Sequence, residues 1–360
     1  MISGRRWTDL ARRPGPDVLG MTPAAVGDDL FRADARRLAE RERSRLAAFL
    51  ANLVRAVERP MRARLLAAID QAAFSALAPA LAAADVDLAL PAIEAAALLD
   101  HPDLLAVPWR RVAEARLREV ARREHPEGGG TVEAALVAPD PAVAACALAY
   151  LAAEARGVRR FDADGDAIPE LSADAQHRLA WVTAAALGFY MTQHHAVPAP
   201  RADALVDDAV RFVLAGYDEG ETLEAHASRL ARALGDAGLI DPALLGGVAR
   251  EGRLTLLAAA LARASGLDLA VAAEALLGDD AERCLALLRL GDVSAVDMSL
   301  LLLRLRALGG GAAPGDAGWV EQRGARYAEL SREAAEDALR RAQLDPIARV
   351  ALTRLEGTRA

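Results

Sequence analysis

The side chains best suited to metal chemistry form a small acidic group in the middle of the chain. Asp162, Asp164 and Asp166 alternate around a glycine, and carboxylates spaced in this way can converge on a hard cation. An EF-hand loop has glycine at its sixth position and glutamate at its twelfth, whereas counting from Asp162 gives Ala167 and Ala173. We therefore interpret the segment as a polar surface turn.

Three histidines lie on one predicted helix that Ser172 caps. His177 is near its start, and the adjacent pair His194 and His195 is at its end. Neighbouring residues on a helix point about a hundred degrees apart, so this pair does not chelate one ion as an i,i+4 pair would. We expect exposed or helix-capping histidines, without a catalytic or metal-binding role.

Basic chemistry in this chain is arginine chemistry, because all 43 of its Lys+Arg residues are arginine. A lysine Schiff base and a P-loop lysine are therefore excluded. Arg110, Arg111, Arg118 and Arg122 lie on a helix predicted over 107–123 and could meet an acidic partner. A solvated helix face is the alternative. These arginines and the three histidines are the candidate interaction surface.

The remaining reactive groups do not form a site. Cys146 and Cys284 both stand in apolar helical stretches, which is typical of small buried side chains in a reducing compartment. The run Gly128 to Gly130 before Thr131 follows no predicted strand and lacks the Gly-Lys-Ser/Thr of a phosphate loop, so we interpret it as a hinge. The sequence predicts no catalytic residue, no cofactor and no metal.

Composition restricts the partners further. The 360 residues carry a formal net charge of −8, which disfavours a general nucleic-acid binder because phosphate neutralisation needs a cationic surface. The N-terminus lacks the apolar run of a signal peptide. The longest apolar runs, 181–191 and 254–262, are too short to span a bilayer. We expect a cytoplasmic protein without a membrane span.

Helix starts recur along the whole sequence. Asp-Pro pairs at 140–141, 241–242 and 345–346 each precede an Ala/Leu-rich amphipathic stretch, and a capping carboxylate before proline is how many helices begin. The segment 279–282 resembles a capping box. No segment alternates in the manner of a strand. The sequence thus predicts an all-α fold, and with 4% aromatic residues its core must consist mainly of Ala, Leu and Val.

Breaks in the helical pattern suggest how the chain is organised. We expect a loosely ordered N-terminus over 1–20, an N-terminal helical lobe over 21–157, a C-terminal helical lobe over 172–308, a Gly-rich linker over 309–318 and terminal helices over 319–360. Helix pairs recur irregularly about every 30 to 45 residues, within the range of HEAT-like repeats in an α-solenoid. A compact helical bundle would give the same pattern.

Apolar and glycine spacing in two stretches resembles one bacterial family. The residues concerned are Leu234-Gly-Asp-Ala-Gly-Leu239, Ala249-Arg-Glu-Gly-Arg-Leu254 and Ala258 to Leu267, with a Leu-Leu turn upstream in Ala89 to Leu105. They look like the bacterial family called domain of unknown function 2336. The resemblance implies an all-helical protein with HEAT-like helix pairs and supplies no catalytic residues.

These observations favour a non-enzymatic helical-repeat protein that binds another protein, because stacked helices present extended surfaces. The alternative is a regulatory helical module in bacterial signal transduction. An enzyme that uses scattered residues is the third reading.

Overall fold

The computed structural model describes residues 40–69, 74–83, 85–124, 130–162, 168–278, 280–309 and 316–342, together with Val26 and Leu30. Every regular element in these ranges is a helix, which confirms the predicted all-α fold. The expected loose N-terminus and the helix predicted after Asp345 lie outside the described residues.

The helices succeed one another with short connections. Their bounds are α2 Glu40–Ala68, α3 Leu77–Ala82, α4 Leu90–Ala95, α5 Pro102–Glu124, α6 Thr131–Ala135, α7 Pro141–Arg156, α8 Ala173–His195, α9 Ala199–Ala215, α10 Leu223–Asp236, α11 Pro242–Glu251, α12 Leu254–Ser265, α13 Leu269–Leu277, α14 Ala281–Leu290, α15 Ala295–Arg306, α16 Asp316–Glu329 and α17 Arg332–Ala342, with 3-10 turns η2 Gly157–Arg159, η3 Glu219–Glu221 and η4 Ala307–Gly309.

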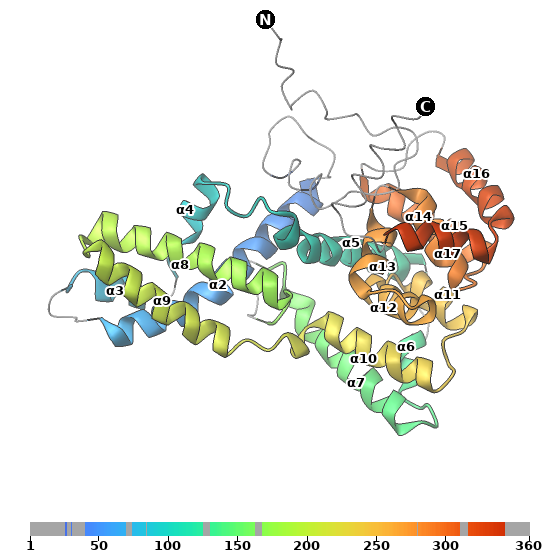
Figure 1. Cartoon of the computed structure of the whole chain (residues 1–360), viewed down its shortest axis with the longest axis horizontal. Coiled ribbons are helices and arrows are strands. Elements are labelled where there is room, and N and C mark those ends of the chain that lie inside the picture. Colours follow the sequence, from blue (N-terminus) through green and yellow to red (C-terminus); the bar gives the residue numbers. More distant parts are fainter. Residues whose placement is uncertain are drawn as a thin grey trace, which may run out of the picture.

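The molecule is elongated, with α5 near its middle (Figure 1). One half contains α2, α3, α4, α8 and α9, in which α2 packs against both members of the α8–α9 hairpin. The other half contains α11 to α17, and the pair of α7 and α10 extends below the centre. Since α5 contacts α2 in one half and both α11 and α12 in the other, it connects the two.

A single cluster of buried apolar side chains runs through both halves, from Val26 to Leu339. Alanine and leucine dominate it, as the low aromatic content predicted. Helix α12 lies deepest, because each residue from Leu254 to Ala262 is buried. Helices of the two expected lobes therefore share one core.

The predicted helix caps are present where the structure describes them. The side chain of Asp140 accepts a hydrogen bond from the amide of Ala142 at 2.8 Å, and that of Asp241 accepts one from Leu244 at 2.7 Å. Ser172 caps α8 through the amide of Ala175. A capping side chain satisfies an amide that the first helical turn leaves free.

Three local predictions need correction. The helix expected over 107–123 begins earlier, at Pro102, and continues through Pro108. The expected linker over 309–318 is shorter at its end, because α16 begins at Asp316. Cys284 is buried as predicted, but Cys146 is only partly buried.

Within the described part of the chain, one helix is long and apolar enough to cross a membrane, namely Pro141–Arg159, which is α7 continued by η2. Of its most apolar stretch, 33% is buried in the protein. The consecutive helices α12 and α13 are long and apolar enough to cross a membrane only when taken together, and the chain bends by 120° between them. Core helices of soluble proteins meet these criteria as well.

Candidate functional site

Helix α5 positions the arginines that the sequence analysis selected. Arg111, Glu114, Arg118 and Arg122 follow one another at steps of three or four residues, so they form one stripe along the helix. The stripe begins in the core, where the Arg111 side chain is fully buried, and ends in solvent at the exposed Arg122. Arginines that occupy equivalent positions along the stripe therefore lie in very different environments, from the core to solvent.

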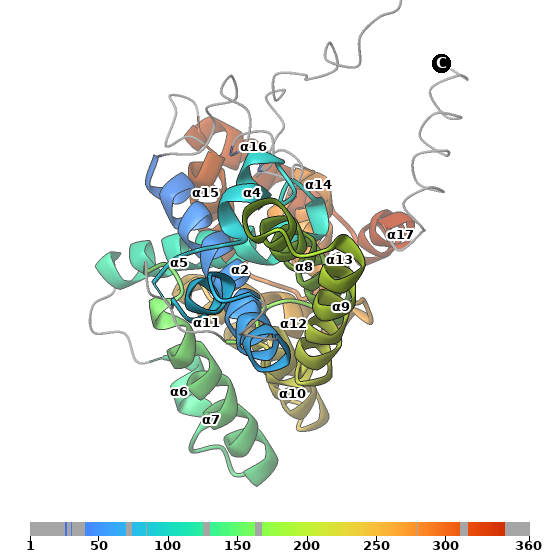
Figure 2. The ribbon, with the colours of Figure 1, turned by 90° about the vertical axis from the view of Figure 1, so that its left-hand side faces the viewer.

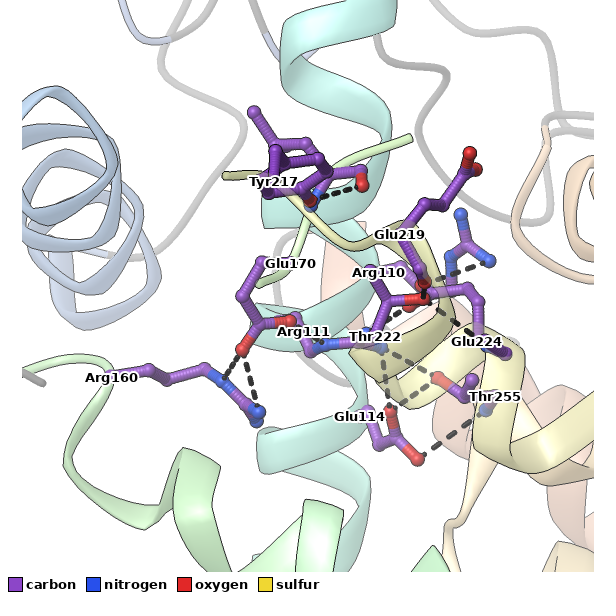
Figure 3. Close-up of polar contacts among 12 residues, drawn as sticks. Arg110, Arg111, Glu114, Arg160, Glu170, Tyr217, Glu219, Thr222, Glu224 and Thr255 are labelled. Carbon is purple, nitrogen blue, oxygen red and sulfur yellow. Dashed lines mark hydrogen bonds and ion pairs between the residues drawn. The ribbon is translucent and has the colours of Figure 1, made fainter. Parts of the chain in front are cut away.

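Arg111 is the centre of a buried charge cluster, which we define as Arg110, Arg111, Glu114, Arg160, Glu170 and Glu224 (Figure 3). Its guanidinium donates to Glu170 at 2.9 Å, to the hydroxyl of Thr255 at 2.8 Å and to Glu224 at 2.5 Å. The Thr255 hydroxyl donates in turn to Glu114 at 2.7 Å.

Two further arginines complete the charge cluster. Arg160 donates to Glu170 at 2.8 Å, and Arg110 lies 3.4 Å from Glu224. Three cations therefore face three carboxylates, contributed by α5, α10 and the segments around residues 160 and 170. Glu224 Oε1 and Arg160 Nη2 make ion pairs but no hydrogen bond. A buried ion pair offsets its desolvation only when its partners are well placed.

The electrostatics of the cluster favour the charged forms of Arg111 and Glu224. Burial by itself would lower the pKa of Arg111, but the carboxylates of Glu224, Glu170 and Glu114 together raise it above its ordinary value. Burial opposes ionisation of Glu224 too, yet Arg111 and Arg110 lower its pKa. Burial lowers the pKa of Arg110 and of Arg160, although Glu224 and Glu170 oppose this. The attraction between the opposite charges links the segments that carry them.

This arrangement corrects the prediction of a single arginine surface. Arg111 is 1% exposed and Arg110 is 9% exposed, so neither is available to an acidic partner, and neither lies on a solvated face. Arginines and glutamates are interspersed along the sequence of α5, and this pattern is typical of a solvated helix face.

Arg118 and Arg122 lie elsewhere, on a polar cavity of about 400 Å³ between α5, α6 and α11. Arg118 pairs with Glu154 at 2.8 Å, whereas Arg122 makes no ion pair with a described residue. Arg253 crosses the cavity to Glu133 at 2.6 Å. Most charges here are already paired within the protein.

The histidines of α8 do not form a site together. His177 accepts a hydrogen bond from the indole of Trp181 at 3.1 Å, and the rings of His194 and His195 both lie about 5 Å from that of Tyr190. His177 and His194 are 17 residues apart on one helix, which separates them by about 26 Å.

The acidic turn is described only at its first residue. Asp162 pairs with Arg159 at 3.4 Å, and its carbonyl accepts a hydrogen bond from Asn52 at 2.7 Å. Asp164 and Asp166 lie outside the described residues. Among the residues that are described, no three His, Cys, Asp or Glu side chains are grouped closely enough to hold a metal ion.

The structure contains an apolar cavity of about 500 Å³ that the sequence did not indicate, which we call the α2/α9 pocket. Its walls include Leu53 and Pro60 of α2 and Phe212 of α9, and Glu170 of the charge cluster lies at its edge. Gln176 of α8 also lines it and is 7% exposed. The wall residues are distant in sequence, so no local pattern could have indicated the pocket.

A second feature that the sequence did not single out is the outer face of α7. We define it as Ala142, Ala145, Leu148, Ala152 and Ala155, all of which are exposed and recur at steps of three or four. The only charged residue from Pro141 to Ala155 is Glu154, which is buried. A helix on the surface of a protein ordinarily carries charges on its outer side.

A third feature that the sequence does not mark is His226 of α10. It is 6% exposed and lies between Arg229, at 3.2 Å, and Arg156, at 3.4 Å. Burial and these cations lower its pKa below the ordinary value, although Glu221 opposes them. The surroundings of His226 therefore favour its neutral form.

Fold and contacts together define an all-helical protein in which a buried charge cluster links several helices and an apolar pocket lies between α2 and α9. The chain belongs to the family described as an uncharacterised protein conserved in bacteria (DUF2336), whose family model matches residues 88–340. This confirms the resemblance drawn from glycine and leucine spacing. No curated protein and no solved structure matches the chain.

Proposed function

We propose that this protein is a non-enzymatic helical protein that binds another protein through the outer face of α7. The observation that carries the proposal is that face itself, which is apolar along its length and has Leu148 at its middle, 63% exposed. Apolar surfaces of this kind mark interaction sites on soluble proteins.

The inner side of α7 is firmly anchored, which supports the proposal. Tyr150 is fully buried, and Glu154 pairs with Arg118 at 2.8 Å and with Arg253 at 3.3 Å. In Figure 2 the pair of α6 and α7 extends at the lower left, away from the bulk of the molecule. A partner would therefore meet a preformed and accessible helix.

The occupant we propose is an apolar helix of a different protein. Four of the five residues of the outer face are alanine, and small side chains let a second helix approach closely. The face carries no charge that would have to be desolvated, so a partner helix with an apolar side fits it best.

We propose that the helices form irregular HEAT-like pairs and that the protein acts in the cytoplasm. The antiparallel neighbours α8 and α9 support the first proposal. The free cysteines Cys146 and Cys284 agree with a reducing compartment.

The test compares Leu148→Glu with Val296→Glu, a matched change at a 77% exposed residue of α15. Each variant is expressed in place of the native protein, crosslinked in cells, purified and analysed by mass spectrometry. We expect a protein that is retained by the wild type and by Val296→Glu but lost by Leu148→Glu. Its binding is then measured with purified components, where the Leu148 variant should weaken affinity at least tenfold.

Other occupants give distinguishable results. Dimerisation of the purified chain that Leu148→Glu abolishes would assign the face to a second copy. Flotation with phospholipid vesicles that depends on Leu148 would assign it to a membrane. Either result, or equal retention of all proteins by both variants, contradicts the proposal.

The regulatory module is the second candidate function. The α2/α9 pocket favours it, because an effector needs a cavity and this one adjoins Glu170 of the charge cluster. A ligand there would contact elements that the cluster joins to α5 and α10.

A further inference from the structure

The α2/α9 pocket has the dimensions of a small-molecule site. Its volume of about 500 Å³ lies within the range of roughly 300 to 1,000 Å³ that is usual for ligand pockets. Leu53 and Pro60 form one wall, and Phe212 and Tyr217 stand on the other. Walls of this kind bind the apolar body of a ligand.

Hydrogen bonds made by the lining residue Tyr217 help to fix the shape of the pocket. The Tyr217 hydroxyl donates to the carbonyl of Leu171 at 2.5 Å and accepts from the amide of Leu171 at 3.1 Å. These bonds hold the end of α9 against the segment that carries Ile168 and Glu170. The pocket is therefore largely preformed, which lowers the cost of binding.

Gln176 supplies a polar group that the protein itself does not use. It is 7% exposed and lines the pocket, yet its carboxamide makes no hydrogen bond with any described residue. The carboxamide oxygen and nitrogen remain accessible from the pocket, so both can meet a ligand there. A ligand that offers a complementary donor and acceptor would satisfy both.

Among the described residues that line the pocket, none offers a free charge to a ligand. Both oxygens of Glu170 are bound, one to Arg111 and one to Arg160. Arg64 stacks on the lining residue Phe212, but it is paired with Asp208 at 2.6 Å. An ion in the pocket would lose its hydration without gaining a counter-ion, so the pocket selects against charged ligands.

We propose that the α2/α9 pocket binds a small, uncharged and largely apolar molecule that carries an amide or similar donor–acceptor group for Gln176. The inference deepens the regulatory candidate and is independent of the outer face of α7. The proposed site includes residues of α2, which lie before residue 88, where the match to the family model begins.

The binding test uses the full chain and two neutral probes, the dye Nile red and benzanilide. Saturable Nile red fluorescence, displaced by benzanilide, is expected for the wild type. Ala56→Phe fills the pocket and should weaken Nile red binding at least tenfold, whereas Ala264→Phe, the same change at an exposed residue of α12, should not alter it. Because Ala56→Phe could unfold the chain, Phe212→Ala at a 54% exposed residue serves as the second pocket variant and should weaken binding severalfold.

Gln176→Leu separates polar recognition from a merely apolar cavity. It removes the carboxamide but keeps an apolar side chain, so Nile red should still bind while the affinity for benzanilide falls at least tenfold. The proposal is overturned if the wild type shows no saturable binding, if the pocket variants bind like Ala264→Phe, or if Gln176→Leu does not weaken benzanilide binding more than Nile red binding. The regulatory function is contradicted separately if benzanilide binds to the protein but does not change which partner proteins are retained through Leu148.

Discussion

At the scale of single residues, burial decides what a charged side chain does. Arg111 and Arg122 are identical residues on one stripe of α5, yet the first is enclosed by three carboxylates and the second is exposed. Asn52, the only asparagine of the chain, is similarly specific, since its amide donates to the carbonyls of Arg160 and Asp162. These roles depend on partners about 60 to 140 residues away.

Arg111→Met should destabilise the protein strongly. The change leaves Glu114, Glu170 and Glu224 buried without their common cation, and such a loss costs about 3–5 kcal/mol. Arg122→Met is the matched control on the same helix and should change the free energy of unfolding by less than about 0.5 kcal/mol. Urea denaturation followed by circular dichroism measures both, and equal effects would contradict the assigned role of Arg111.

His226 should make stability depend on pH. Its pKa is lowered by burial and by Arg229 in the folded state, so below about pH 6.5, the ordinary pKa of histidine, the unfolded chain takes up a proton that the folded chain resists. Stability is therefore complete above this pH and falls as pH drops through the lowered pKa. The slope contributed by one proton is at most about 1.4 kcal/mol per pH unit.

The measurement compares the free energy of unfolding of the wild type and of His226→Gln between pH 7.5 and 5.5. The variant lacks the titrating group, so the wild type should lose more stability on acidification. A wild type that gains stability relative to the variant would mean that Glu221 dominates over Arg229.

At the scale of elements, local sequence is a reliable guide to where helices begin. Asp140, Asp241 and Ser172 act as caps because the groups they satisfy are amides two or three residues away. Helix ends are guided in the same way, since Gly252 and Gly266 follow α11 and α12 in the left-handed conformation. Apolar spacing agrees with the burial of Val143 and Ala147 of α7, whereas no such pattern marks the burial of Arg110 and Arg111 of α5.

The two helix-terminating glycines should respond differently to alanine. Both have a φ near +70°, so alanine costs about 1–2 kcal/mol at each for its backbone conformation. At Gly252 a Cβ would also lie 2.7 Å from the carbonyl carbon of Leu117 on α5, whereas nothing lies within 4 Å at Gly266. We expect Gly252→Ala to cost about 1–3 kcal/mol more than Gly266→Ala.

Thermal unfolding of the two variants, followed by circular dichroism, checks this difference. Equal melting temperatures would mean that α5 and α11 separate easily, which would contradict the close packing at Leu117.

At the scale of the whole molecule, α5 and the shared core join two ends that look separate in the elongated shape (Figure 1). The charge cluster adds contacts between α5, α10 and α12 at the same place. A molecule connected in this way should unfold as one unit, because neither end keeps its core when the centre opens.

Substitutions at opposite ends should therefore shift one common transition. Leu65→Ala in α2 and Leu287→Ala in α14 each remove a buried side chain and should cost about 2–5 kcal/mol. For both variants the midpoints from far-ultraviolet circular dichroism and from tryptophan fluorescence should move together. A shift of one probe without the other would indicate two independent folding units.

The sequence by itself determined the class of the fold, the family and most helix starts, because capping, proline geometry and apolar periodicity act over a few neighbouring residues. Tertiary structure alone decided that Arg110 and Arg111 are buried and that Leu53 meets Phe212 across a pocket. It also decided that the outer face of α7 stays exposed. The physical reason is that burial depends on which distant helix covers a surface, and residues far apart in the chain carry no local sign of that contact.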